Sequence, residues 1–178
     1  MQLIAITKPD FYDGEAAFIK RLFESGFDIV HLRKPNSDID NCRNILNELS
    51  SEERSRIVVH DYPELYYEFS LKGIHINKNI VKYPEGYQGF KTRSCHSLEE
   101  VKLYKDEFDY VFLSPIFDSI SKQGYKSAFT QEELRKASQE GIIDKKVVAL
   151  GGVTYDRISL LKDLGFGGAA MMGGVFIS

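Results

Sequence analysis

The sequence of 178 residues carries a formal net charge of -3, and 43% of its residues are hydrophobic and 28% are charged. This balance is typical of globular chains, and it excludes a disordered protein or one that holds nucleic acid through a general basic field. No apolar run approaches the roughly 18 residues of a membrane span, and the N-terminus lacks the basic region of a signal peptide. We therefore expect a single domain over residues 1–178, located in the cytoplasm, with neither nucleic acid nor a membrane as partner.

Eight short apolar runs predict buried strands along the chain. They cover residues 3–7, 29–33, 57–61, 73–76, 91–95, 110–115, 147–151 and 168–172. Stretches with helical spacing of apolar residues separate most of the runs, at residues 15–25, 40–49, 98–106, 131–138 and 156–164, with a shorter one at 63–71. Continuous apolar strands that alternate with amphipathic helices are typical of a parallel sheet covered by helices.

Local sequence signals mark the ends of several predicted helices. Two residue pairs have the spacing of a capping box, Ser97 with Glu100 and Thr130 with Glu133. Two glycines, Gly26 and Gly165, follow the last periodic residue of a predicted helix.

Eight strand units favour a compact (β/α)8 TIM barrel, and a flavodoxin-like open sheet is the alternative fold. The units average about 22 residues, which is short for this barrel, so some crossovers must be abbreviated. Residues 77–90 are expected to form a loop in place of a helix, and a final helix is missing or short after residue 172.

The predicted carboxyl ends of the strands carry an unusual number of polar residues, and ligands bind at this end in both folds. Arg33 has the geometry of a bidentate anion ligand, and Lys122 adds a positive charge in a loop. Asp61 is either a ligand for Mg²⁺ or the cap of the following helix.

The histidines at these strand ends leave two interpretations open. His60, His75 and His96, together with Asp61, form a candidate zinc site, or each imidazole forms a hydrogen bond with nearby backbone. The two cysteines, Cys42 and Cys95, lie too far apart for a thiolate metal motif.

Two glycine pairs end the last two apolar runs. Gly151 and Gly152 follow one run, and Gly173 and Gly174 follow the other. Glycine lets backbone N–H groups approach a ligand closely, and such groups bind anions without help from a side chain. We expect these pairs to hold a phosphate.

The ordered set of strand ends resembles the thiamine phosphate synthase family and its relative, the thiazole tautomerase family. The likeness rests on segments along nearly the whole chain: residues 31–34, 59–61, 73–76, 93–97, 109–117 through Lys122, 148–153 and 168–173. The resemblance implies a (β/α)8 barrel that joins an aminopyrimidine methyl diphosphate to a thiazole phosphate and releases diphosphate. Small phosphorylated heterocycles are then the partners, and homo-oligomer formation is left open.

The resemblance also implies a role for each matching residue. Arg33, Lys122 and Ser94 form the catalytic set, with Arg33 and Lys122 on the diphosphate and Ser94 and Ser119 at the leaving group. The metal is Mg²⁺, bound by Asp61 and Asn79. The substrate-binding set comprises His31, His60, His96, Ser119, Gly151, Gly152, Gly173 and Gly174.

The chain departs from the family pattern at several of these positions. The family has Gln-Leu-Arg-Glu-Lys where this chain has His31 to Pro35, Asn-Asp where it has His60 and Asp61, and an acidic residue at Asn79. Two further functions therefore stay open, a thiazole tautomerase-like isomerase and a non-catalytic barrel that binds a phosphorylated ligand.

Overall fold

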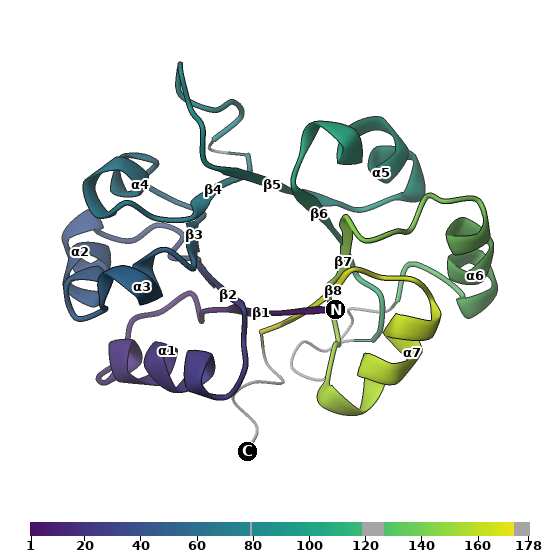
Figure 1. The fold of residues 1–178 in the computed structure, drawn as a ribbon, viewed down its shortest axis with the longest axis horizontal. Helices are drawn as coiled ribbons and strands as arrows, with labels where there is room; N and C mark the ends of the chain where they lie inside the picture. The colour runs from purple at the N-terminus through teal and green to yellow at the C-terminus, as the bar shows by residue number, and fades with distance from the viewer. Residues whose placement is uncertain (79, 119–126, 173–178) are drawn as a thin grey trace. The chain divides into compact units, whose positions relative to one another are not determined.

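Eight short parallel strands form a closed barrel in sequence order (Figure 1). The computed structural model describes residues 1–78, 80–118 and 127–172. Its strands are β1 (Gln2–Ile6), β2 (Ile29–Leu32), β3 (Ile57–Val59), β4 (Gly73–Ile76), β5 (Phe90–Cys95), β6 (Tyr110–Leu113), β7 (Val147–Ala149) and β8 (Gly168–Met171). The predicted (β/α)8 barrel is confirmed, because the flavodoxin-like alternative has an open sheet.

Helices follow most of the strands, as the apolar spacing predicts. They are α1 (Glu15–Glu24), α2 (Ile39–Asn47), α3 (Ser51–Arg54), α4 (Glu64–Phe69), α5 (Leu98–Tyr104), α6 (Gln131–Gln139) and α7 (Ile158–Asp163), with short 3-10 turns η1 (Lys105–Glu107) and η2 (Tyr155–Arg157). Helix α3 was not predicted because four residues are too few to show a period, although Ser50 and Glu53 form a complete capping box before it. Between β4 and β5 the described residues contain no helix, which agrees with the predicted abbreviated crossover.

The predicted helix ends are largely correct. Gly26 and Gly165 have φ of 95° and 80°, the left-handed conformation that closes a helix. Thr130 and Glu133 exchange both bonds of a capping box. Ser97 forms only half of one, because the Glu100 carboxylate accepts from the His96 N–H, at 2.6 Å, and not from Ser97.

Five of the strands are shorter than predicted, namely β2, β3, β6, β7 and β8, and all five are buried as predicted. Every residue of β2, β3, β6, β7 and β8 is buried, as in a parallel sheet covered on both faces. Strand β2 ends before Arg33, and β3 ends before His60, whose backbone N–H still donates to the Leu32 carbonyl at 3.1 Å. The early end of β2 leaves the half-buried Arg33 side chain where a ligand can reach it.

The chain divides into two compact units, which are treated separately below. One comprises residues 4–91, and the other comprises residues 1–3 with 92–178. The first holds Arg33 and Asp61, and the second holds the Gly151–Gly152 pair. The single domain expected over residues 1–178 stays a prediction.

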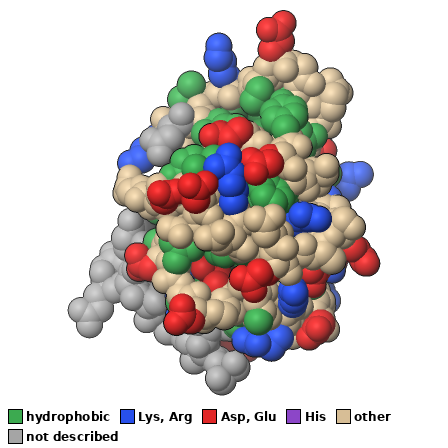
Figure 2. Space-filling view, turned by 90° about the vertical axis from the view of Figure 1, so that its left-hand side faces the viewer, with side chains coloured by type: hydrophobic (Ala, Val, Ile, Leu, Met, Phe, Trp, Pro, Cys, Tyr) green, Lys and Arg blue, Asp and Glu red, His purple; other side chains and the backbone are tan. Residues whose placement is uncertain are grey.

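The surface over α2 and α4 mixes acidic and basic side chains (Figure 2). Arg43 of α2 contacts Asp40 at 2.8 Å and Glu68 of α4 at 3.0 Å, and all three side chains are partly exposed. No helix of the described residues is long and apolar enough to cross a bilayer.

Candidate functional site

Three histidines of the first unit form a buried cluster, named here the histidine cluster: His31 of β2, His60 after β3 and His75 of β4. Their exposed fractions are 0%, 6% and 2%. Nδ1 of His31 lies 2.7 Å from Nε2 of His60, within hydrogen-bond distance. The rings of His60 and His75 stack at 4.1 Å between centroids and 14° between planes.

Burial sets the charge state of the cluster. It lowers the pKa of His31 and His60 well below the usual histidine value, and the nearby charge of His75 lowers both further. The charge of Arg33 acts on His60 in the same direction. Both imidazoles are therefore neutral at pH 7, so they offer hydrogen bonds and lone pairs and no positive charge.

The cluster differs from the zinc set expected from the sequence. His31 replaces His96 and Asp61 in it, because the register β2–β3–β4 brings His31 opposite Val58 and Val58 opposite Gly73. With side chains alternating along a strand, His60 and His75 then share the face of His31. The second interpretation, a backbone hydrogen bond for each imidazole, stays a prediction for His60 and His75; one ring nitrogen of His60 contacts His31.

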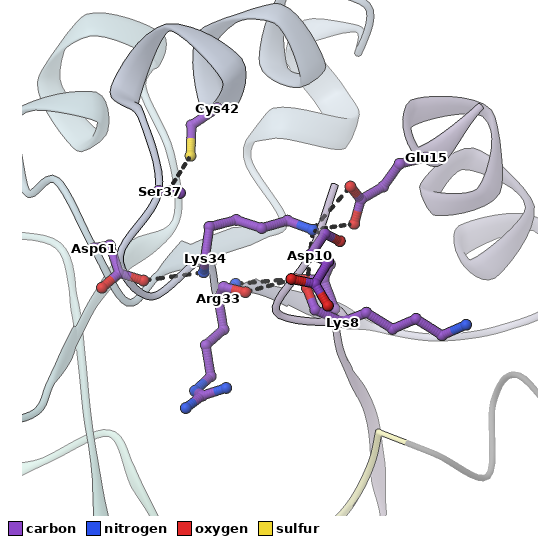
Figure 3. A network of polar contacts seen from close by, with 9 residues as sticks. Lys8, Asp10, Glu15, Arg33, Lys34, Ser37, Cys42 and Asp61 are labelled. Atoms are coloured by element: carbon purple, nitrogen blue, oxygen red, sulfur yellow. Dashed lines mark hydrogen bonds and ion pairs between the residues drawn. The ribbon is translucent and has the colours of Figure 1, made fainter. Parts of the chain in front are cut away.

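Arg33 is fixed through its backbone by Thr7 at the end of β1. The Thr7 hydroxyl accepts from the Arg33 N–H at 3.0 Å and donates to the Arg33 carbonyl at 3.3 Å. Figure 3 shows the Arg33 side chain pointing away from the neighbouring Lys34. Its guanidinium forms no hydrogen bond or ion pair with another residue in the described part of the chain, so its donors are available to a ligand.

Lys34 has a different role from Arg33, although the two are adjacent. Its Nζ lies 2.6 Å and 2.8 Å from the carboxylate oxygens of Glu15 in α1, and it donates to the carbonyls of Lys8 and Asp10 at 2.9 Å each (Figure 3). The side chains of Lys34 and Glu15 are 0% and 2% exposed. All the ammonium donors are thus used inside the protein, and they tie the loop after β1 to the end of β2.

Asp61 lies beside Lys34 at the end of β3. Its Oδ2 accepts from the Lys34 backbone N–H at 3.0 Å. The alternative that Asp61 caps the next helix is wrong, because Pro63 is the N-cap of α4 and no side chain caps that helix. The carboxylate is half-buried.

In the second unit, Gly151 and Gly152 follow β7 with φ of 92° and 61°. Their carbonyls accept from the Phe117 N–H at 3.0 Å and from Arg157 Nη1 at 2.7 Å. Their own N–H groups reach no other residue of the described ranges. A Cβ on Gly152 would lie 2.3 Å from the Asp118 carbonyl oxygen. Both the backbone conformation and the space therefore require glycine here.

Strand β5 carries Ser94, and His96 follows it. Ser94 is half-buried and pairs in register with Phe112 of β6. His96 is exposed, and its Nδ1 lies 3.2 Å from the carbonyl oxygen and 3.3 Å from the hydroxyl of Ser114. The imidazole of His96 thus has the backbone contact that the sequence suggests.

Several predicted site residues lie outside the described residues. They are Asn79, Ser119, Lys122, Gly173 and Gly174. Their predicted roles stay predictions.

Two features around Arg33 were not predicted from the sequence. The Lys34–Glu15 ion pair joins residues 19 positions apart, and no spacing rule links a strand end to the first turn of the preceding helix. The sequence indicated the role of Thr7 only weakly, because it shows a polar residue at the end of an apolar run.

The thiamine monophosphate synthase family model matches residues 3–175. A thiamine-phosphate synthase of Limosilactobacillus reuteri is 29% identical over 129 residues, which are 68% of this chain and 59% of that protein.

Solved structures are similar as well. The crystal structure of thiamine phosphate pyrophosphorylase from Bacteroides thetaiotaomicron is 43% identical, with a TM-score of 0.91 over 99% of this chain and 85% of that one. A thiamine phosphate pyrophosphorylase from Pyrococcus furiosus, 20% identical, has a TM-score of 0.75 over 97% of this chain and 85% of that one, and it shows the same fold.

Proposed function

The chain belongs to the thiamine monophosphate synthase family, and we propose that it joins an aminopyrimidine methyl diphosphate to a thiazole phosphate and releases diphosphate. The resemblance read from the strand ends is confirmed, and with it the class of enzyme, a transferase of this family. The reaction requires that a diphosphate leave, so its developing negative charge has to be neutralised and the attacking ring held in place.

The proposal rests mainly on the fixed backbone and the available guanidinium of Arg33. Thr7 holds its backbone on both sides, and its guanidinium is left for an external partner. A guanidinium binds phosphate oxygens through two parallel hydrogen bonds, which fixes orientation as well as charge. We assign Arg33 to the diphosphate, and Lys122 to the same group.

Asp61 fits one ligand position of Mg²⁺. Only its Oδ2 accepts a protein hydrogen bond among the described residues, which leaves Oδ1 for a hard cation. Asn79 is proposed as the second oxygen ligand, and a neutral amide binds Mg²⁺ more weakly than a carboxylate. Bound Mg²⁺ would neutralise charge on the diphosphate while Asp61 holds the ion in place.

Gly151 and Gly152 are proposed to bind the thiazole phosphate. Their N–H groups are available, and their carbonyls are fixed by Phe117 and Arg157. Backbone N–H groups held in this way bind an anion with little reorganisation. Gly173 and Gly174 are proposed to complete the phosphate site.

The remaining assignments are hydrogen-bonding roles. Ser94 and Ser119 are proposed at the leaving group, and His31, His60 and His96 at the substrates. His31 and His60 would act as neutral hydrogen-bond partners, because burial keeps them uncharged. The cytoplasmic location and a homo-oligomeric state stay predictions.

The direct test is incubation of the full chain with both precursors and Mg²⁺, with chromatographic detection of thiamine phosphate and of diphosphate. We expect both products in equal amounts, and a large loss for Arg33→Gln. Arg43→Gln is the matched control, because it removes an arginine that only forms surface ion pairs. Absence of product at any enzyme concentration would refute the proposal. Calorimetric binding of the thiazole phosphate without turnover would then favour a non-catalytic binding protein.

A further inference from the structure

We propose that the histidine cluster binds a divalent transition metal ion that prefers imidazole ligands, such as Zn²⁺ or Co²⁺. Its ligand nitrogens all lie within 4.8 Å of one another, and they come from β2, the end of β3, and β4. Among the described residues this is the single group of three or more His, Cys, Asp or Glu side chains close enough to share an ion. The site is distinct from the oxygen ligands proposed for Mg²⁺.

The chemistry of the cluster suits such an ion. Transition metals bind imidazole nitrogens, and the cluster supplies three imidazole rings whose ligand atoms lie close together. Three histidines with one open position form a common zinc arrangement. The cluster contains no carboxylate, so the bound ion would keep its positive charge. The open position therefore favours an anionic fourth ligand, such as hydroxide or a phosphate oxygen.

The distances are close to those that the ion requires. Zinc–nitrogen bonds of the usual length place the nitrogens of a tetrahedral site about 3.3 Å apart. In the cluster the His31–His60 pair is closer than this, at 2.7 Å, and no pair exceeds 4.8 Å. The ring of His31 is inclined by 73° to each of the other two rings, so its lone pair can converge with theirs.

One ring has to turn when the ion binds. His60 and His75 are stacked with nearly parallel planes, and two parallel rings cannot both direct an in-plane lone pair at one ion. One of them must rotate about its Cβ–Cγ bond. The proton between His31 and His60 must also move to another ring nitrogen, since both facing nitrogens would become ligands. Binding of the ion would thus replace the His31–His60 hydrogen bond and the His60–His75 ring stack with three coordinate bonds.

Titration of the metal-depleted full chain with Co²⁺ tests the site, because Co²⁺ bound by imidazole has visible absorption bands. We expect one equivalent to bind, Zn²⁺ to displace it, and excess Mg²⁺ to leave it in place. His31→Gln and His75→Gln should each weaken binding at least about tenfold. His96→Gln, which changes an exposed histidine outside the cluster, should leave the affinity unchanged.

Three results would overturn the proposal. The first is the absence of a Co²⁺ absorption spectrum for the folded wild-type chain. The second is displacement of Co²⁺ by Mg²⁺, and the third is an unchanged Co²⁺ affinity in both folded cluster variants. If the variants do not fold, X-ray absorption of the Zn²⁺-loaded wild-type chain decides, because three imidazoles at about 2.0 Å are required. None of these readouts depends on synthase activity, so failure here is distinguishable from failure of the proposed function.

Discussion

Replacement of Lys34 by methionine should strongly destabilise the protein. Methionine has a similar length, but it leaves the Glu15 carboxylate and the carbonyls of Lys8 and Asp10 without their common donor. The Lys34 and Glu15 side chains are 0% and 2% exposed, so water cannot readily replace the ammonium group. Removal of one partner from a buried ion pair costs about 3–5 kcal/mol. We expect a loss of this size in the free energy of unfolding at neutral pH.

The loss should depend on pH. Burial raises the pKa of Glu15, and the hydrogen bond and charge of Lys34 oppose that rise. Without Lys34 the folded-state pKa of Glu15 rises further above the unfolded value. Between these two values the native state binds more protons than the unfolded state, so stability falls as pH increases through the window. The defect of Lys34→Met should therefore be largest at neutral pH and smaller in mild acid.

Urea unfolding followed by circular dichroism measures both effects. The double variant Lys34→Met, Glu15→Leu should recover most of the stability, since an apolar pair can replace a buried ion pair. Arg43→Gln is the surface control, and its ion pairs with Asp40 and Glu68 should contribute less than about 1 kcal/mol. A loss below about 1 kcal/mol for Lys34→Met, or a loss that does not change with pH, would refute the reasoning.

Three further substitutions test the proposed site. Gly152→Ala should lower the melting temperature more than Gly141→Ala. Both glycines have a positive φ, 61° at Gly152 and 70° at Gly141, but only at Gly152 would the added Cβ lie 2.3 Å from a carbonyl oxygen, that of Asp118. Equal shifts in melting temperature would contradict this. Arg33→Lys should raise KM for the diphosphate substrate roughly tenfold, because lysine cannot bind bidentately, and an unchanged KM would remove Arg33 from the diphosphate site. Asp61→Asn should raise the Mg²⁺ concentration needed for half-maximal rate, and an unchanged Mg²⁺ curve would exclude Asp61 as a ligand.

Local patterns predicted most of the fold. The alternation of apolar runs and amphipathic stretches identified the barrel, because burial of a parallel strand needs only a few consecutive apolar residues. Gly26 and Gly165 marked helix ends correctly, since a left-handed cap depends on the residue at that position and not on distant contacts. Gly152 also has a positive φ, and its role in an anion site stays a prediction.

Contacts between distant residues could not be predicted in this way. The sequence indicated Arg33 as a ligand residue, but it gave no sign that the adjacent Lys34 is used internally by Glu15. Likewise, the histidines were recognised as polar residues at strand ends, but His31 and not His96 joins His60 and His75.

The sequence by itself therefore determined the kind of fold and the family, because these depend on periodicity and on short motifs at strand ends. Only the tertiary structure decided which charged groups are available to a ligand and which are satisfied inside the protein. That distinction depends on strand register and on where each strand ends: β2 ends before Arg33, β3 ends before His60, and the β2–β3–β4 register brings the histidines together.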